Sequence, residues 1–176
     1  MNKNDTLIGI EKSFTVLIDG IHRLTEEQFA YISNPEKWSL AQMYEHICES
    51  SKKFFLANIK RCLDQRSGQI GGEKTLAGEW VMNNNGFPNK KVKMPEEFGV
   101  VIYKGKPKNE YLLEIEEILA AAKDLVELIH QDAGDYKSKH PVFGFLNAQE
   151  WFRNLEMHTR HHLIQMAELE ALAAHV

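Results

Sequence analysis

The stretch "NAQEWFRNLEMHTRHHLIQMAELEAL", residues 147–172, decides the fold, because one side of it repeats with the period of a helix. Alternating steps of four and three residues connect a single row: Trp151, Leu155, His158, His162, Gln165, Leu169 and Leu172. This spacing is typical of a helix with one buried face. The row is apolar at both ends and polar over its three middle positions. We therefore predict a helix over 147–174 whose inner face carries polar groups.

The same rhythm predicts three more long helices, over 5–24, 39–65 and 109–131. In the second, Met43, Ile47, Phe54, Ile59 and Cys62 fall roughly on one side. The segments "SLAQ" (39–42) and "NAQE" (147–150) are typical capping boxes, and "TEEQ" (25–28) predicts a further short helix. All five prolines lie outside the four long segments. We expect an all-α fold, a single domain over 1–176 built as an antiparallel four-helix bundle.

Composition excludes several classes of function. The chain has 176 residues, 43% hydrophobic and 26% charged, with a net charge of −4. No basic stripe suits a nucleic acid, so we expect none as a partner. The N-terminal residues form neither a signal peptide nor a membrane span, which predicts a cytoplasmic protein without a membrane partner. Cys48 and Cys62 would lie about 21 Å apart on one helix, too far to form a disulfide.

A long crossover, residues 67–107, joins the second and third helices. It holds seven of the eleven glycines and three of the five prolines. Such long loops are uncommon in compact domains unless they have a role. We expect it to travel back along the bundle and form part of a substrate pocket, with "FGVVIY" (98–103) packed across the helices. The pocket side chains would be Trp80, Asn83, Asn84 and Phe87; a plain surface connector is the alternative.

His158 and His162 are candidate metal ligands, because residues at i and i+4 lie one turn apart on one helical face. His46, in "WSLAQMYEHICES", lies on or beside the buried face of the second helix and could meet them in the core. The alternative is a set of neutral core histidines, each with a hydrogen bond. Gln165 could orient an imidazole or be a plain polar residue.

The remaining histidines carry no site prediction. His161 falls out of the inward register, so we expect it on the flank of the helix or in solvent. For the others we expect surface or capping roles: His22, His130, His140 and His175.

Three segments together resemble the DinB-like superfamily of metal-binding four-helix bundles: "WSLAQMYEHI" (38–47), "HPVFGFLNAQEWF" (140–152) and "HTRHHLIQM" (158–166). The similar features are a Trp-Ser entry with a histidine seven residues after the serine, a His-Pro-x-x-Gly turn, and H-x-x-x-H-x-x-Q. The resemblance implies that His46, His158 and His162 are the three metal-ligand histidines. The superfamily includes thiol S-transferases, hydrolases of the YfiT type and many proteins of unknown activity, so the resemblance leaves the reaction open.

Three neutral imidazoles leave open positions on a divalent ion, which is the catalytic arrangement. We therefore predict a metal-dependent enzyme with Zn or Ni, acting on a small molecule such as a low-molecular-weight thiol. The alternatives are a non-catalytic metal- or ligand-binding bundle and a protein–protein module with a polar histidine core. The resemblance, together with apolar residues such as Phe152 and Leu163 on outer helix faces, predicts a homodimer.

Overall fold

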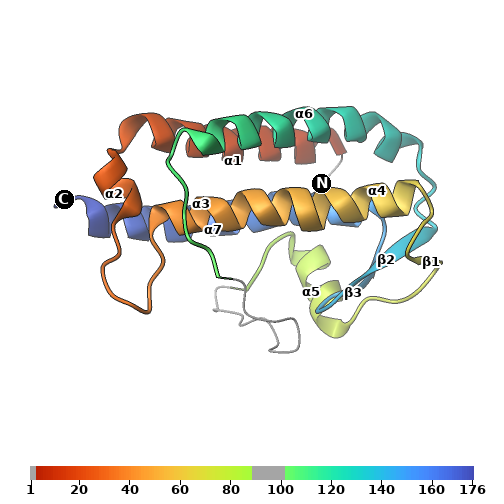
Figure 1. Ribbon diagram of the computed structural model, residues 1–176. Helices are drawn as coiled ribbons and strands as arrows, with labels where there is room; N and C mark the ends of the chain where they lie inside the picture. The colour runs from red at the N-terminus through yellow and green to blue at the C-terminus, as the bar shows by residue number, and fades with distance from the viewer. Residues whose placement is uncertain (1–2, 89–101) are drawn as a thin grey trace.

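The computed structural model describes residues 3–88 and 102–176 and contains the four predicted long helical segments (Figure 1). The second segment is continuous but is divided by a π-helical stretch, and two short helices lie between the long ones. The helices are α1 (Lys3–Arg23), α2 (Glu26–Ala30), α3 (Leu40–Glu49), η1 (Ser50–Leu56), α4 (Ala57–Leu63), α5 (Leu76–Asn84), α6 (Glu110–Gln131) and α7 (Ala148–Ala173). The all-α four-helix bundle is therefore confirmed.

Side-chain caps begin three of these helices where the sequence predicted them. Thr25, Ser39 and Asn147 each accept a hydrogen bond from the backbone N–H three residues later. The Gln or Glu at that third position accepts one back from the backbone N–H of the capping residue. These reciprocal bonds satisfy donors that a helix start otherwise leaves free.

The crossover sets the direction of the helices. Figure 1 shows α6 running the same way as α3 and α4, and the Tyr111 hydroxyl at the start of α6 donates to the Ala41 carbonyl at the start of α3 (2.8 Å). α7 runs the opposite way to α3 and α4 and lies beside both. The histidines in the middle of α7 therefore lie beside α3, which carries His46.

The second long segment departs from the regular helix that the sequence predicted. A buried row with steps of four residues passes through η1 from α3 to α4: Ile47, Ser51, Phe55 and Ile59. A π-helix turn is wider than an α-turn, so this spacing keeps the four on one side. As a result Phe55 is buried at 3% exposure, whereas the predicted Phe54 is only partly buried.

A small sheet lies where the sequence predicted only loop. β1 (Gln69–Ile70) pairs antiparallel with β2 (Tyr136–His140), which pairs antiparallel with β3 (Gly144–Leu146). Gly144 takes a φ of +79°, which favours glycine, at the turn of this hairpin. The strands are too short to show an alternating pattern, and β1 comes from a distant part of the chain.

The described part of the crossover returns along the bundle, as predicted. After β1, the backbone of Lys74 pairs with that of Gly144 in an isolated antiparallel β-bridge. Further along, the carbonyl of Met82 in α5 accepts a hydrogen bond from the Arg153 guanidinium on α7. Of "FGVVIY" (98–103), residues 98–101 lie outside the described residues. Among the described helices, none combines the length and apolar character that a membrane span requires.

The apolar residues Phe152 and Leu163, proposed for the outer face of α7, both contact the core. Phe152 is fully buried, and Leu163 is partly buried against the core. α7 is contacted by α1 on one side and by α3 and α4 on another, so its N-terminal half is buried almost all round. The predicted inner row also ends early, because Leu172 is 37% exposed. Phe152 and Leu163 therefore give no support to a dimer interface.

Candidate metal centre

His46, His158 and His162 meet between α3 and α7. The Nε2 atom of His46 lies 3.2 Å from that of His158 and 2.9 Å from that of His162, and the last two are 3.1 Å apart. Among the described residues, these three form a group whose ligand atoms could hold one metal ion. The three nitrogens form a small triangle whose corners come from two antiparallel helices.

Such a triangle suits a cation better than it suits a hydrogen-bond network. A neutral imidazole has one N–H and one lone pair, so it donates from one nitrogen and accepts at the other. When the protons sit on the Nδ1 atoms, three lone pairs converge with nothing between them. Zn–N bonds are about 2.0–2.1 Å long, and a cation bound to all three nitrogens would offset this repulsion. The donor set therefore fits a divalent ion.

Burial keeps the three imidazoles neutral. Desolvation, followed by the charge of His162, lowers the pKa of His46 to about 3. Desolvation also lowers the pKa of His162 to about 4, and with the neighbouring histidines it holds the pKa of His158 well below its ordinary value. Only the neutral imidazole has a lone pair for a metal, so each of the three rings has one nitrogen lone pair at neutral pH.

Two of the three imidazoles have a hydrogen-bond partner at their outer nitrogen. The Nδ1 of His46 lies 3.0 Å from the Tyr103 hydroxyl. The Nδ1 of His162 lies 3.0 Å from Oε1 of Gln165, an acceptor, which places the proton on Nδ1 and the lone pair on Nε2. In the described chain, the buried Nδ1 of His158 has no partner. Gln165 therefore occupies the place expected of an orienting residue, at the outer nitrogen of His162.

Aromatic side chains surround the cluster. The rings of Trp38 and Tyr103 each lie 5.2 Å from the His46 ring, centroid to centroid. On the other side, Phe55 packs 4.9 Å and Phe87 6.5 Å from the ring of His158. These walls limit access of water and lower the local dielectric, which strengthens electrostatic interactions inside the site.

His161 lies beside the cluster and is not one of its corners. It is partly buried, it accepts a hydrogen bond from Nε2 of Gln165 (3.2 Å), and its ring lies 5.6 Å from that of Phe87. Gln165 therefore links it to His162. The flank position predicted from the register holds, although the side chain is less exposed than expected.

His140 is buried, at 6% exposure, where we expected a surface or capping residue. Its ring stacks on Phe143 at 4.2 Å, and its Nδ1 accepts hydrogen bonds from the backbone N–H groups of Val142 and Phe143. The side chain does cap the hairpin turn, but from inside the core, because the unpredicted hairpin folds over it.

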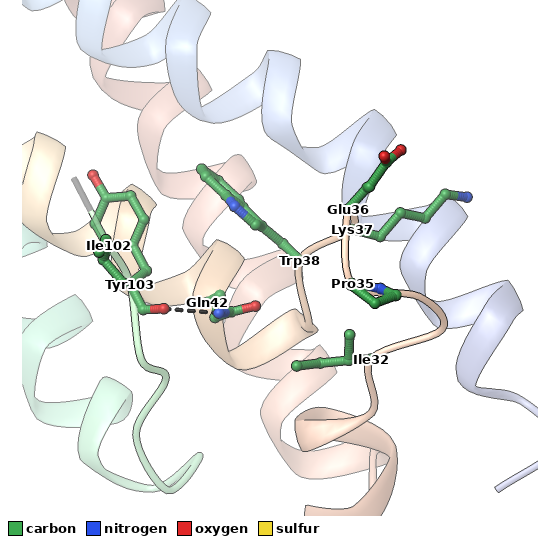
Figure 2. Close-up of a pocket in the computed structure, with 8 residues that line it drawn as sticks. All are labelled: Ile32, Pro35, Glu36, Lys37, Trp38, Gln42, Ile102 and Tyr103. Atoms are coloured by element: carbon green, nitrogen blue, oxygen red, sulfur yellow. Dashed lines mark hydrogen bonds between the residues drawn. The ribbon is translucent and has the colours of Figure 1, made fainter. Parts of the chain in front are cut away.

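A pocket of about 300 Å³ opens beside His46 (Figure 2). Trp38 and Gln42 lie between Ile32 on one side and Tyr103 on the other, and both aromatic rings also contact His46. The lining residues are Ile32, Pro35, Glu36, Lys37, Trp38, Gln42, Ile102 and Tyr103. The pocket thus shares its wall with the histidine cluster.

Only one of the four crossover side chains predicted at a pocket is seen to approach the histidines. Phe87 packs against His158 and His161. Trp80 is 46% exposed, Asn83 is exposed, and the Asn84 amide donates to the carbonyl of Trp80. The buried side of α5 consists instead of Gly78, Val81 and Met82.

Sequence reasoning missed Tyr103 and Phe55. Tyr103 stands 57 residues from His46, so no helical spacing connects them. Phe55 was missed because η1 moves the buried side of the helix by one position. The one available signal for η1 was the five-residue step from Phe54 to Ile59 in the predicted row, which a regular α-helix does not make.

Comparisons with known proteins agree with the fold. No curated protein matches the chain. Among solved structures, it is similar to YfiT from Bacillus subtilis, described as a probable metal-dependent hydrolase with an unusual four-helix bundle topology. The TM-score is 0.62 at 13% identity, covering 95% of this chain and 85% of that one. The DinB superfamily model matches residues 11–166, which include all three converging histidines. This chain belongs to the DinB superfamily.

Proposed function

We propose that the protein is a metal-dependent enzyme in which His46, His158 and His162 hold one divalent ion, Zn²⁺ or Ni²⁺. The observation that carries this proposal is the triangle of Nε2 atoms, with sides of 2.9 to 3.2 Å. Three neutral ligands leave the ion its full positive charge and leave coordination positions open, as in catalytic zinc sites.

Hydrolysis of a small molecule is the reaction that we propose. A divalent ion with open positions activates a water or thiol nucleophile and polarises a carbonyl group. Support comes from the superfamily and from the likeness to YfiT, a probable metal-dependent hydrolase. The pocket beside His46 has the volume expected for a small ligand, about 300 Å³.

The protein's own groups prepare the site. Burial keeps the imidazoles neutral, and Gln165 holds the Nδ1 proton of His162 so that its Nε2 lone pair faces the other two histidines. Phe55 and Phe87 cover His158 and keep water from competing for its nitrogens. Groups that are fixed in place and shielded from water stabilise the charge that develops in a transition state more strongly than water does.

Elemental analysis of protein purified without a histidine tag tests the metal site. We expect near-stoichiometric Zn or Ni, and uptake of either metal by the chelated protein at micromolar concentration. Protein that takes up neither metal would show that the histidines form only a polar core network, and the proposal would fail.

Assays with and without a chelator test the reaction. We expect metal-dependent cleavage of a generic ester or amide. Turnover of a low-molecular-weight thiol with an electrophile, but not of esters or amides, would instead identify a thiol S-transferase. A metal-loaded protein inactive in both assays would point to a non-catalytic metal-binding bundle.

A further inference from the structure

We propose that Tyr103 is a positioning residue whose hydroxyl accepts the Nδ1–H of His46 and thereby turns the Nε2 lone pair of that imidazole toward His158 and His162. The inference rests on the proposed metal site. It assigns a role to a residue that the crossover contributes and that the sequence placed only within the packed segment "FGVVIY" (98–103).

The geometry at His46 allows two arrangements of one proton. Either Nδ1–H donates to the Tyr103 oxygen, 3.0 Å away, or the tyrosine hydroxyl donates to a bare Nδ1. In the second arrangement the imidazole proton sits on Nε2, where it points at nitrogens 2.9 and 3.2 Å away and excludes a cation. Only the first arrangement leaves His46 as a ligand.

Ser50 lies close to both His46 and Tyr103. Its Oγ atom lies 3.5 Å from the Nδ1 of His46, and its hydroxyl partly opposes the rise that burial gives the pKa of the Tyr103 phenol. The Tyr103 oxygen is closer to that nitrogen, at 3.0 Å, so the phenol is the nearer acceptor for the Nδ1–H of His46. Gln165 plays the corresponding part at His162, through its Oε1 atom.

The backbone of Tyr103 is tied to the same helix as its side chain. Its carbonyl accepts a hydrogen bond of 2.7 Å from Nε2 of Gln42, one turn before His46 on α3, as Figure 2 shows. The Oε1 atom of Gln42 accepts from the backbone N–H of Ser39 in the capping box. The Tyr103 ring also packs edge-on against Trp38, at 5.3 Å. These contacts hold the hydroxyl in place before any metal binds.

Tyr111 provides a matched control. Its hydroxyl also ties the end of the crossover to α3, because it accepts from the backbone N–H of Lys106 and donates to the carbonyl of Ala41. It contacts none of the three histidines through a hydrogen bond that the structure describes. A purely structural role for a crossover tyrosine would therefore appear in both Tyr→Phe variants.

The experiment compares Zn²⁺ affinity, by chelator competition, in the wild-type protein, Tyr103→Phe and Tyr111→Phe. Loss of such an outer partner typically weakens metal binding about 10- to 100-fold, and we expect this for Tyr103→Phe alone. In the Zn-loaded wild type, we also expect the Nδ1–H proton of His46 to give an NMR signal protected from solvent exchange. That protection should be lost in Tyr103→Phe.

The outcomes separate this inference from the proposed function. Wild-type protein that binds no Zn²⁺ would overturn the metal site and this inference with it. Wild-type and Tyr103→Phe proteins with equal affinity and equal protection of the His46 proton would overturn the inference alone. An equal loss of affinity in both Tyr→Phe variants would also overturn it, because the effect would then come from docking of the crossover.

Discussion

At the scale of single residues, the histidines of α7 are not equivalent. His162 has its Nε2 in the triangle, whereas neighbouring His161 only accepts a hydrogen bond from Gln165. We expect His158→Ala and His162→Ala each to weaken Zn²⁺ binding by more than about 100-fold, beyond the loss typical of an outer partner. His161→Ala, the matched control, should keep metal stoichiometry unchanged in elemental analysis. A loss of metal in all three variants would show that His161 is also a ligand.

His140 should make the stability of the protein depend on pH. Desolvation lowers its pKa to about 3 in the folded protein, and its Nδ1 already accepts two backbone N–H groups. Below its ordinary pKa of about 6.5 the unfolded chain binds a proton that the folded protein does not. The free energy of unfolding therefore falls with falling pH, by about 1.4 kcal/mol per unit for this one group.

His140→Asn tests this dependence, because the asparagine oxygen can still accept from the turn but does not titrate. The comparison is made between about pH 4.5 and 6, which lies between the folded and unfolded pKa values of His140. There the free energy of unfolding should fall less steeply with falling pH in the variant, by about 1.4 kcal/mol per pH unit, the contribution of one bound proton. Denaturant titrations at several pH values measure the slope. Parallel slopes for the two proteins would contradict the buried, neutral state of His140.

At the scale of elements, the packing of α5 against the hairpin depends on a glycine. A Cβ added at Gly78 would lie 2.2 Å from the carbonyl oxygen of Phe143, which is backbone and cannot move aside easily. We expect Gly78→Ala to displace α5 and to expose the crossover to limited proteolysis. The metal should remain, because α3 and α7 supply the three histidines.

Gly86→Ala is the control for that experiment, since a Cβ there meets nothing closer than 3.8 Å. It should leave proteolysis unchanged. If the crossover forms part of the substrate pocket, Gly78→Ala should also lose turnover while it keeps its metal. Full activity in a variant with a displaced α5 would favour a plain surface connector.

At the scale of the whole molecule, metal binding should stabilise the fold. A ligand that binds only the folded state adds about 2.7 kcal/mol at a concentration 100 times its Kd. We expect Zn²⁺ to raise the Tm of the chelated wild-type protein and to leave that of His158→Ala unchanged. Thermal unfolding with and without Zn²⁺ measures both. An equal shift in the two proteins would indicate binding elsewhere.

The homodimer stays a prediction that rests on the family resemblance, since Phe152 is buried and Leu163 is partly buried against the core. Sedimentation velocity at micromolar concentration tests it. We expect a single species with twice the mass of the chain, and a monomer would contradict it. Metal-loaded and chelated samples should be compared, because the three histidines all come from one chain and need no partner to meet.

What the sequence by itself determined is local. Helix positions follow from apolar spacing of three and four residues, and Thr25, Ser39 and Asn147 mark three helix starts because a cap involves residues only three apart. The pairing of His158 with His162 is local in the same sense. The positions of Met43 and Ile47 predicted His46 on or beside the buried face of its helix, and its side chain is half-buried there.

The tertiary structure decided the rest, because those contacts join segments that no short-range pattern connects. His46 meets α7 only because the crossover and the helix directions bring the two helices together antiparallel. Tyr103 reaches His46 across 57 residues, and β1 pairs with a strand that follows α6. In η1 the demands of packing changed the helix itself, so that Phe55 rather than Phe54 lies against His158. Local chemistry predicts elements, whereas the surroundings of a site depend on how distant elements pack.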